Sequence, residues 1–187
     1  MGMVIFLVVV VAVVFWVIGA YNGLIALKNR VVNAWKQIDV QLKRRHDLIP
    51  NLIEAVKGAM GFERQTLEAV IAARANAVTA RGVAATARAE GELTQALGRL
   101  FALAENYPDL KATGNVAQLQ EELTSTENKI AFARQLYNDE ATLYNTRQEQ
   151  FPTNLVAGLA KASPAELWAI EDPAERAVPK VDLGFGS

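Results

Sequence analysis

The chain has 187 residues, a formal net charge of −1 and no cysteine. This length holds an anchor and one domain of typical size, without a second globular domain. The small net charge argues against nucleic-acid binding, which needs a basic excess, and the absence of cysteine excludes disulfides and cysteine-ligated metals. Gly and Pro are scarce through the middle, where Ala, Leu, Glu, Gln and Arg dominate, as in long helices. We expect an all-α protein whose N-terminal transmembrane helix continues into an up-and-down antiparallel four-helix bundle.

The first element is an uncharged apolar run over residues 3–20. As a helix it spans about 27 Å, close to the hydrocarbon thickness of a bilayer. A lone strand cannot satisfy its backbone in lipid, so the segment must be helical. We therefore predict a membrane anchor over residues 1–20. Its anchor residues are Met3, Val4, Ile5, Phe6, Leu7, Val10, Val14, Phe15, Trp16, Ile18 and Gly19.

The alternative for this segment is a cleaved signal peptide, which needs a basic leader and a small-x-small cleavage site. Only Met1 and Gly2 precede the run, and Ile18 stands where a small residue is required, so we favour an uncleaved anchor. The flank after the run is basic, which predicts a single-pass cell-membrane protein with its N-terminus outside and the bundle in the cytoplasm. Gly19 and Gly23 form a small-xxx-small pair that suits close helix approach, although such pairs also arise by chance.

The bundle is expected over residues 21–151. Its first helix carries an apolar stripe and should end or kink at Pro50, where the chain changes direction. A second helix is predicted over residues 51–79, a connection over the Ala- and Gly-rich residues 80–91, and a third helix over residues 93–107. The fourth, over residues 116–151, has a coiled-coil-like seam with steps of three and four, interrupted by polar Thr126, Glu140 and Arg147.

Several short motifs together resemble the LemA family. They include YNGL at Tyr21, AWKQIDVQLKRRHDLIPNL over residues 34–52, YPDLKA at Tyr107, YN at Tyr137 and again at Tyr144, and FP at Phe151. The family motif residues are Asp39, Arg44, Arg45, Asp47, Pro50 and Asn51. The resemblance implies a membrane helix followed by a cytoplasmic four-helix bundle, with proposed links to envelope stress and to membrane proteases of the HtpX kind. Phe62 departs from the family, which often has histidine there.

Catalytic chemistry is not expected from these residues. A di-metal carboxylate bundle needs Glu-x-x-His pairs, whereas His46 is the only histidine and has no glutamate three positions before it. We interpret His46 as a solvated or capping residue at a helix end. The serines lack a histidine partner and a nucleophile-elbow sequence. We therefore predict no catalytic, cofactor-binding or metal-binding residues.

Four charged residues lie on or beside the apolar stripes and need partners: Glu63, Arg74, Glu127 and Arg134. We interpret them as a structural ionic cluster between helices. The alternatives are a polar ligand pocket and simple solvated edges.

The tail, residues 152–187, is rich in proline, with one short helix predicted over residues 164–170. Its apolar Leu167, Trp168 and Ile170 need burial, either on the same bundle or on a neighbouring subunit.

The function that fits best is a membrane-anchored scaffold or adaptor that acts through protein contacts and self-assembly. We expect a homo-oligomer with candidate subunit contacts at Gly19, Gly23, Leu167, Trp168 and Ile170. The rival is an enzyme of unfamiliar type that uses Glu and Arg in the bundle core, which a deep polar pocket would favour.

Overall fold

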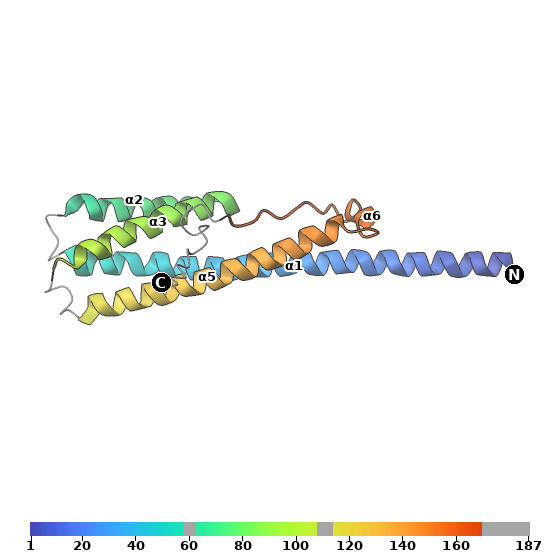
Figure 1. Ribbon diagram of the computed structural model, residues 1–187, viewed down its shortest axis with the longest axis horizontal. Helices are drawn as coiled ribbons and strands as arrows, with labels where there is room; N and C mark the ends of the chain where they lie inside the picture. The colour runs from blue at the N-terminus through green and yellow to red at the C-terminus, as the bar shows by residue number, and fades with distance from the viewer. Residues whose placement is uncertain (58–62, 108–113, 170–187) are drawn as a thin grey trace, which may run out of the picture.

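The computed structural model describes residues 1–57, 63–107 and 114–169. These form helices α1 (Gly2–Lys57), α2 (Arg64–Thr79), α3 (Val83–Ala104), α5 (Gly114–Glu149) and α6 (Asn154–Ala157), as Figure 1 shows. No strand occurs within the described ranges, so the all-α prediction is confirmed for them.

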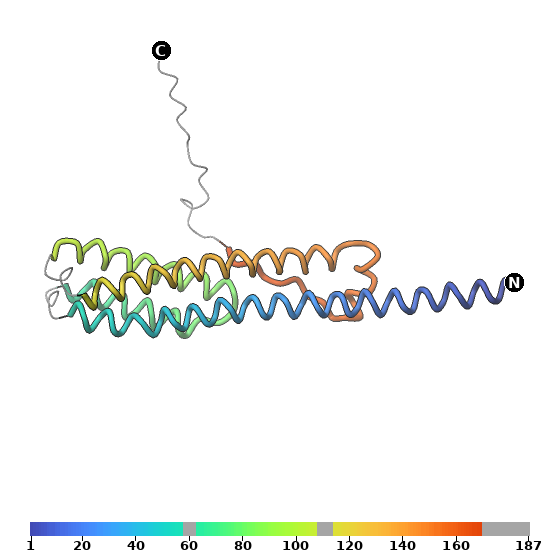
Figure 2. Tube along the Cα trace, turned by 90° about the horizontal axis from the view of Figure 1, so that it is seen from below, coloured from blue at the N-terminus to red at the C-terminus, as the bar shows by residue number. Residues whose placement is uncertain are grey.

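The architecture is built along α1. Its N-terminal end projects alone, whereas α5 runs back along α1 from its far end, and α2 and α3 pack as a pair beside that far end (Figures 1 and 2). All four long helices contribute to one hydrophobic core, which contains Leu52, Val70, Leu93 and Leu123. A second core lies between α1 and α5 nearer the N-terminus, around Ile38 and Tyr137. Helices α1, α3 and α5 supply most of the residues in these two cores because their apolar positions recur every three or four residues.

Pro50 does not end the first helix, so of the two predicted alternatives, an end or a kink, the end is excluded, and the prediction of a second helix from residue 51 is wrong. α1 continues through it to Lys57, so residues 51–57 belong to the first helix and the second begins at Arg64. Proline removes an amide donor, and a helix passes through it only where the carbonyl left without a partner is satisfied in another way.

The predicted connection over residues 80–91 is also wrong in extent. α2 ends at Thr79 and α3 already begins at Val83, after Gly82 with a φ of 83°, a left-handed conformation that favours glycine. Alanine is the best helix former, so the Ala-rich stretch is a helix without a bulky stripe. Its buried face consists of small or polar residues: Thr86, Ala87, Ala89 and Glu90.

The short helix of the tail lies earlier than predicted. Helix α6 covers Asn154–Ala157, whereas residues 162–169 have no helical structure. Ile170, Phe62 and the YPDLKA residues from 108 to 112 lie outside the described residues.

Candidate functional site

The apolar start of α1 is the first functional feature. It is the helix among the described residues that is long and apolar enough to cross a membrane, and none of its most apolar stretch is buried. Phe6, Phe15 and Ile18 are exposed along with their neighbours. A continuous exposed apolar surface of this size is unfavourable in water and suited to lipid. All of the predicted anchor residues lie on this projecting part of α1 or at its base, so they belong to the surface that is suited to lipid.

A buried ionic cluster joins α1, α3 and α5. The side chains of Arg45 and Glu90 are each only 4% exposed, and Arg45 Nη1 lies 3.1 Å from Glu90 Oε2. The same nitrogen lies 3.1 Å from Oε2 of the more exposed Glu127, and Arg45 Nη2 donates to Thr94 Oγ1 at 2.8 Å. His46 Nε2 lies 2.6 Å from Glu90 Oε1. Charges this deeply buried are tolerated only when they are paired, and here Arg45 has three acceptors.

The predicted ionic cluster has a different composition in the structure. Of its four members only Glu127 joins Arg45. Glu63 accepts a hydrogen bond from Tyr107 Oη at 3.3 Å, and Arg74 Nε donates to the backbone oxygen of His46 at 2.7 Å. Glu90 was missed because it lies in the stretch expected to be a connection. His46, expected to be solvated or to cap a helix end, is instead inside α1 and partly buried.

The two YN motifs hold the tail. Asn138 exchanges two backbone hydrogen bonds with Trp168, since its Nδ2 donates to Trp168 O at 3.1 Å and its Oδ1 accepts from Trp168 N at 2.9 Å. Asn145 binds Ala165 in the same way, at 2.8 and 2.7 Å. One heptad separates the motifs, so both asparagines lie on the same side of α5. They clamp the extended segment over residues 165–168.

Aromatic contacts complete this clamp. The Trp168 ring is buried with its centroid 5.9 Å from that of Trp35, which in turn lies 5.4 Å from Tyr137. Arg134 lies over the Trp168 ring at 5.4 Å, a cation–π geometry. Tyr137 Oη donates to Glu166 O at 2.7 Å. The tail therefore packs against α1 and α5 of the same chain, and Trp168 is not available as a surface contact, whereas Leu167 stays exposed.

Tyrosine pKa values reflect these surroundings. Burial raises the pKa of Tyr137, and the nearby Glu166 carboxylate raises it further. Burial also raises the pKa of Tyr144, the tyrosine of the second YN motif. Both phenols therefore stay protonated to higher pH than in an unfolded chain.

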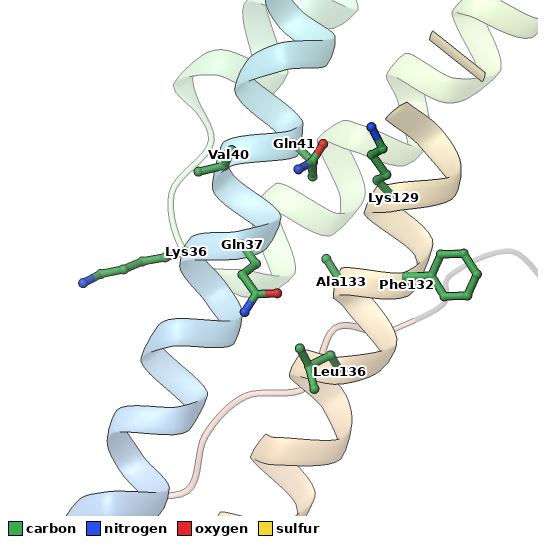
Figure 3. A pocket seen from close by; sticks show the side chains of 8 residues that line it. All are labelled: Lys36, Gln37, Val40, Gln41, Lys129, Phe132, Ala133 and Leu136. Carbon is green, nitrogen blue, oxygen red and sulfur yellow. The ribbon is translucent and has the colours of Figure 1, made fainter. Parts of the chain in front are cut away.

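An apolar groove runs between α1 and α5 on the surface (Figure 3). Its volume is about 470 Å³, and its floor and walls include Gln41, Ala133 and Leu136. Val40 on one rim and Phe132 on the other are 62% and 74% exposed, and Phe132 points away from the groove. Gln41 Oε1 is buried with no hydrogen-bond partner among the described residues. The groove is thus open to solvent, has the exposed Phe132 ring at its edge and contains a buried acceptor, Gln41 Oε1, without a partner among the described residues.

The remaining predicted residues lie mostly on the surface. Arg44 Nη2 is 3.8 Å from Glu122 Oε2, a long and solvent-exposed pair. The motif residues Asp39, Asp47, Pro50 and Asn51 are exposed. Gly19 and Gly23 line a cavity of about 250 Å³ against Arg147 and Thr153 of the same chain. In the described part of the chain, no group of three His, Cys, Asp or Glu side chains is arranged to hold a metal ion.

Comparison with known proteins agrees with the motifs. The sequence profile described as the LemA family matches residues 34–183. A protein named LemA from Metamycoplasma hominis is 28% identical over 157 residues, covering 82% of this chain and 71% of that protein. The magnetosome protein MamQ 2 from Paramagnetospirillum magneticum is 25% identical over 198 residues, covering 92% of this chain and 72% of its own length.

Proposed function

Because this chain belongs to the LemA family, we propose that it is a membrane-anchored, non-enzymatic helical scaffold that assembles with copies of itself. One observation carries the proposal: the exposed apolar segment and the helix that packs against α5 are the same uninterrupted α1. Because the anchor and a core helix are one continuous helix, the orientation of the anchor in the membrane also fixes the orientation of the whole domain.

The body in this proposal is an up-and-down bundle of α1, α2, α3 and α5. Support comes from the core that all four helices share. The basic residues after the anchor, among them Lys28 and Arg30, support a cytoplasmic body. Protease added outside intact spheroplasts should leave this body undigested. Digestion of the body would show the opposite orientation, with the body outside the cell.

The assembling surface is the groove between α1 and α5, and its occupant is a second copy. Phe132 and the groove residue Ala133 are adjacent in sequence, so the protruding side chain and the hole lie at the same level of the bundle. Copies held by the same anchor are parallel and at the same height. A two-fold axis along the membrane normal then brings Phe132 of each copy to the groove of the other.

Polar groups around the groove fit the same arrangement. Lys36 and Lys129 line it and are exposed, so their ammonium groups can stay hydrated at the edge of the contact. Confinement to a membrane raises the effective concentration of the copies, so a small contact suffices for assembly.

Cysteine crosslinking tests this surface against a clean background, because the chain has no cysteine of its own. Two differently tagged copies, one with Val40→Cys and one with Phe132→Cys, are co-expressed and oxidised in native membranes. We expect a disulfide-linked dimer that carries both tags. Val78→Cys, on the exposed surface of α2, replaces Val40→Cys as the matched control and should give little product. Equal yields from both pairs, or a full-length monomer in detergent at all concentrations, would exclude the proposed assembly.

A further inference from the structure

The α5–α6 turn, residues 150–159 with α6 inside it, lies beside the anchor. Helix α6 packs against α1 and α5 (Figures 1 and 2). Arg147 and Thr153 line one cavity with Trp16, Gly19, Ala20 and Gly23 of α1. The turn therefore lies level with the last turns of the apolar segment of α1.

The side chains of this turn divide into an inward set and an outward set. Thr153 and Val156 are buried, at 4% and 2% exposure. Phe151, Leu155 and Leu159 are 80%, 66% and 72% exposed. Large apolar side chains at such exposure on one short turn need a partner surface.

We propose that this turn is a second membrane contact, in which Phe151, Leu155 and Leu159 insert into the headgroup and upper acyl region of the bilayer. The inference rests on the proposed anchoring by α1, because α1 sets the height of the turn. Because α1 holds the turn at the height of the bilayer surface in every copy, lipid is the partner surface available to these side chains, and no further protein is needed.

The charges around the turn suit that position. Arg147 and Lys161 flank the apolar side chains, with Glu149 as the acidic neighbour. Basic side chains at the membrane surface interact with anionic headgroups while neighbouring apolar side chains insert. Trp16, level with the turn, is of the residue type enriched at membrane interfaces. The membrane contact would therefore fix the tilt of the bundle as well as its distance from the bilayer.

Fluorescence quenching by lipids tests the contact in the full-length protein. Single cysteines at Leu155→Cys, Val78→Cys and Val10→Cys are labelled with the same environment-sensitive dye in vesicles that contain anionic phospholipid. A fraction of the lipid carries a nitroxide near the top of the acyl chain. Val78 is the control, since it is exposed on α2 and lines a pocket with Trp35 of α1, about 24 Å along that helix from Gly19.

We expect quenching at position 155 to exceed that at position 78 by at least about twofold. Adding Phe151→Ser and Leu159→Ser should reduce the quenching at 155 toward the value at 78, with the helical circular dichroism unchanged. Equal quenching at 155 and 78, together with strong quenching at position 10, would overturn the membrane contact but keep the anchor. Absence of quenching at position 10 would instead overturn the anchor itself.

Discussion

Arg74 in α2 donates its Nε to the backbone oxygen of His46 in α1 across 2.7 Å. In a regular α-helix this carbonyl would accept from the amide four residues later, which here is Pro50 and has no N–H. The guanidinium of a neighbouring helix therefore replaces the hydrogen bond that proline removes. This contact explains how α1 continues past Pro50 and also ties α2 to α1.

A double-mutant cycle measures this replacement. Arg74→Leu leaves the His46 carbonyl unpaired and should lower the free energy of unfolding by about 1–3 kcal/mol, followed by circular dichroism during denaturation in mild detergent. In a Pro50→Ala background the restored amide at position 50 can pair with that carbonyl, so the same substitution should cost about 1 kcal/mol less. Strictly additive effects would show that Arg74 does not compensate for the proline.

The buried pair of Arg45 and Glu90 gives a second prediction. Arg45→Met leaves Glu90 buried without its main cation and should cost about 3–5 kcal/mol of unfolding free energy. Arg44→Met is the matched control, because its pair with Glu122 is exposed and should contribute at most about 1 kcal/mol. Replacing both buried partners, with Arg45→Met and Glu90→Leu together, should recover part of the loss. A similar small cost at both arginines would contradict the role assigned to the cluster.

The asparagine clamp is tested by releasing the tail. Asn138→Ala removes both hydrogen bonds to the Trp168 backbone, so the amides of residues 165–168 should exchange hydrogen at least about tenfold faster. Hydrogen exchange with mass spectrometry detects this change. Asn128→Ala, at an exposed asparagine of the same helix, should leave the exchange of the tail unaltered. Identical exchange in the two variants would mean that Asn138 does not hold the tail.

Alkaline pH should weaken the same region. The pKa of Tyr137 is raised in the folded chain, mainly by burial, so the unfolded state releases the phenolic proton first as pH rises through about 10. The stability that protonated Tyr137 contributes below about pH 10 is therefore lost as the pH rises toward the pKa of Tyr137 in the folded chain. We expect Tyr137→Phe to be less stable at neutral pH, by about 1 kcal/mol for the lost hydrogen bond to Glu166, yet to lose less on going to alkaline pH. A decline as steep as that of the unmodified protein would oppose this interpretation.

Periodicity predicted the helices where bulky apolar residues recur, as at Leu93, Leu97 and Leu100, which are buried as expected. It failed where the buried face is small or polar, because Ala87 and Glu90 give no bulky stripe. The continuation of α1 past Pro50 was not predicted because the compensating donor, Arg74, comes from another helix and leaves no local signal.

The tail shows the same limit at the candidate site. Sequence reasoning recognised that Trp168 needs burial and that the YN motif occurs twice, at Tyr137 and at Tyr144. It did not connect them, because asparagine side chains bind the backbone of the tail, which carries no sequence signature. The available clue was the repeat of the YN motif at Tyr144. It indicates that asparagines on one side of α5 bind another segment of the chain, which is the tail.

Membrane extraction tests the central claim most directly. Membranes from cells that produce the full-length protein are washed with alkaline carbonate, and the protein is measured in pellet and supernatant. Val10→Arg combined with Val11→Arg adds about 5–7 kcal/mol to the insertion of α1 near its centre. We predict that the unmodified protein stays in the pellet and that the double-arginine variant moves to the supernatant. An unmodified protein released by carbonate, or a double-arginine variant that resists it, would contradict anchoring by α1.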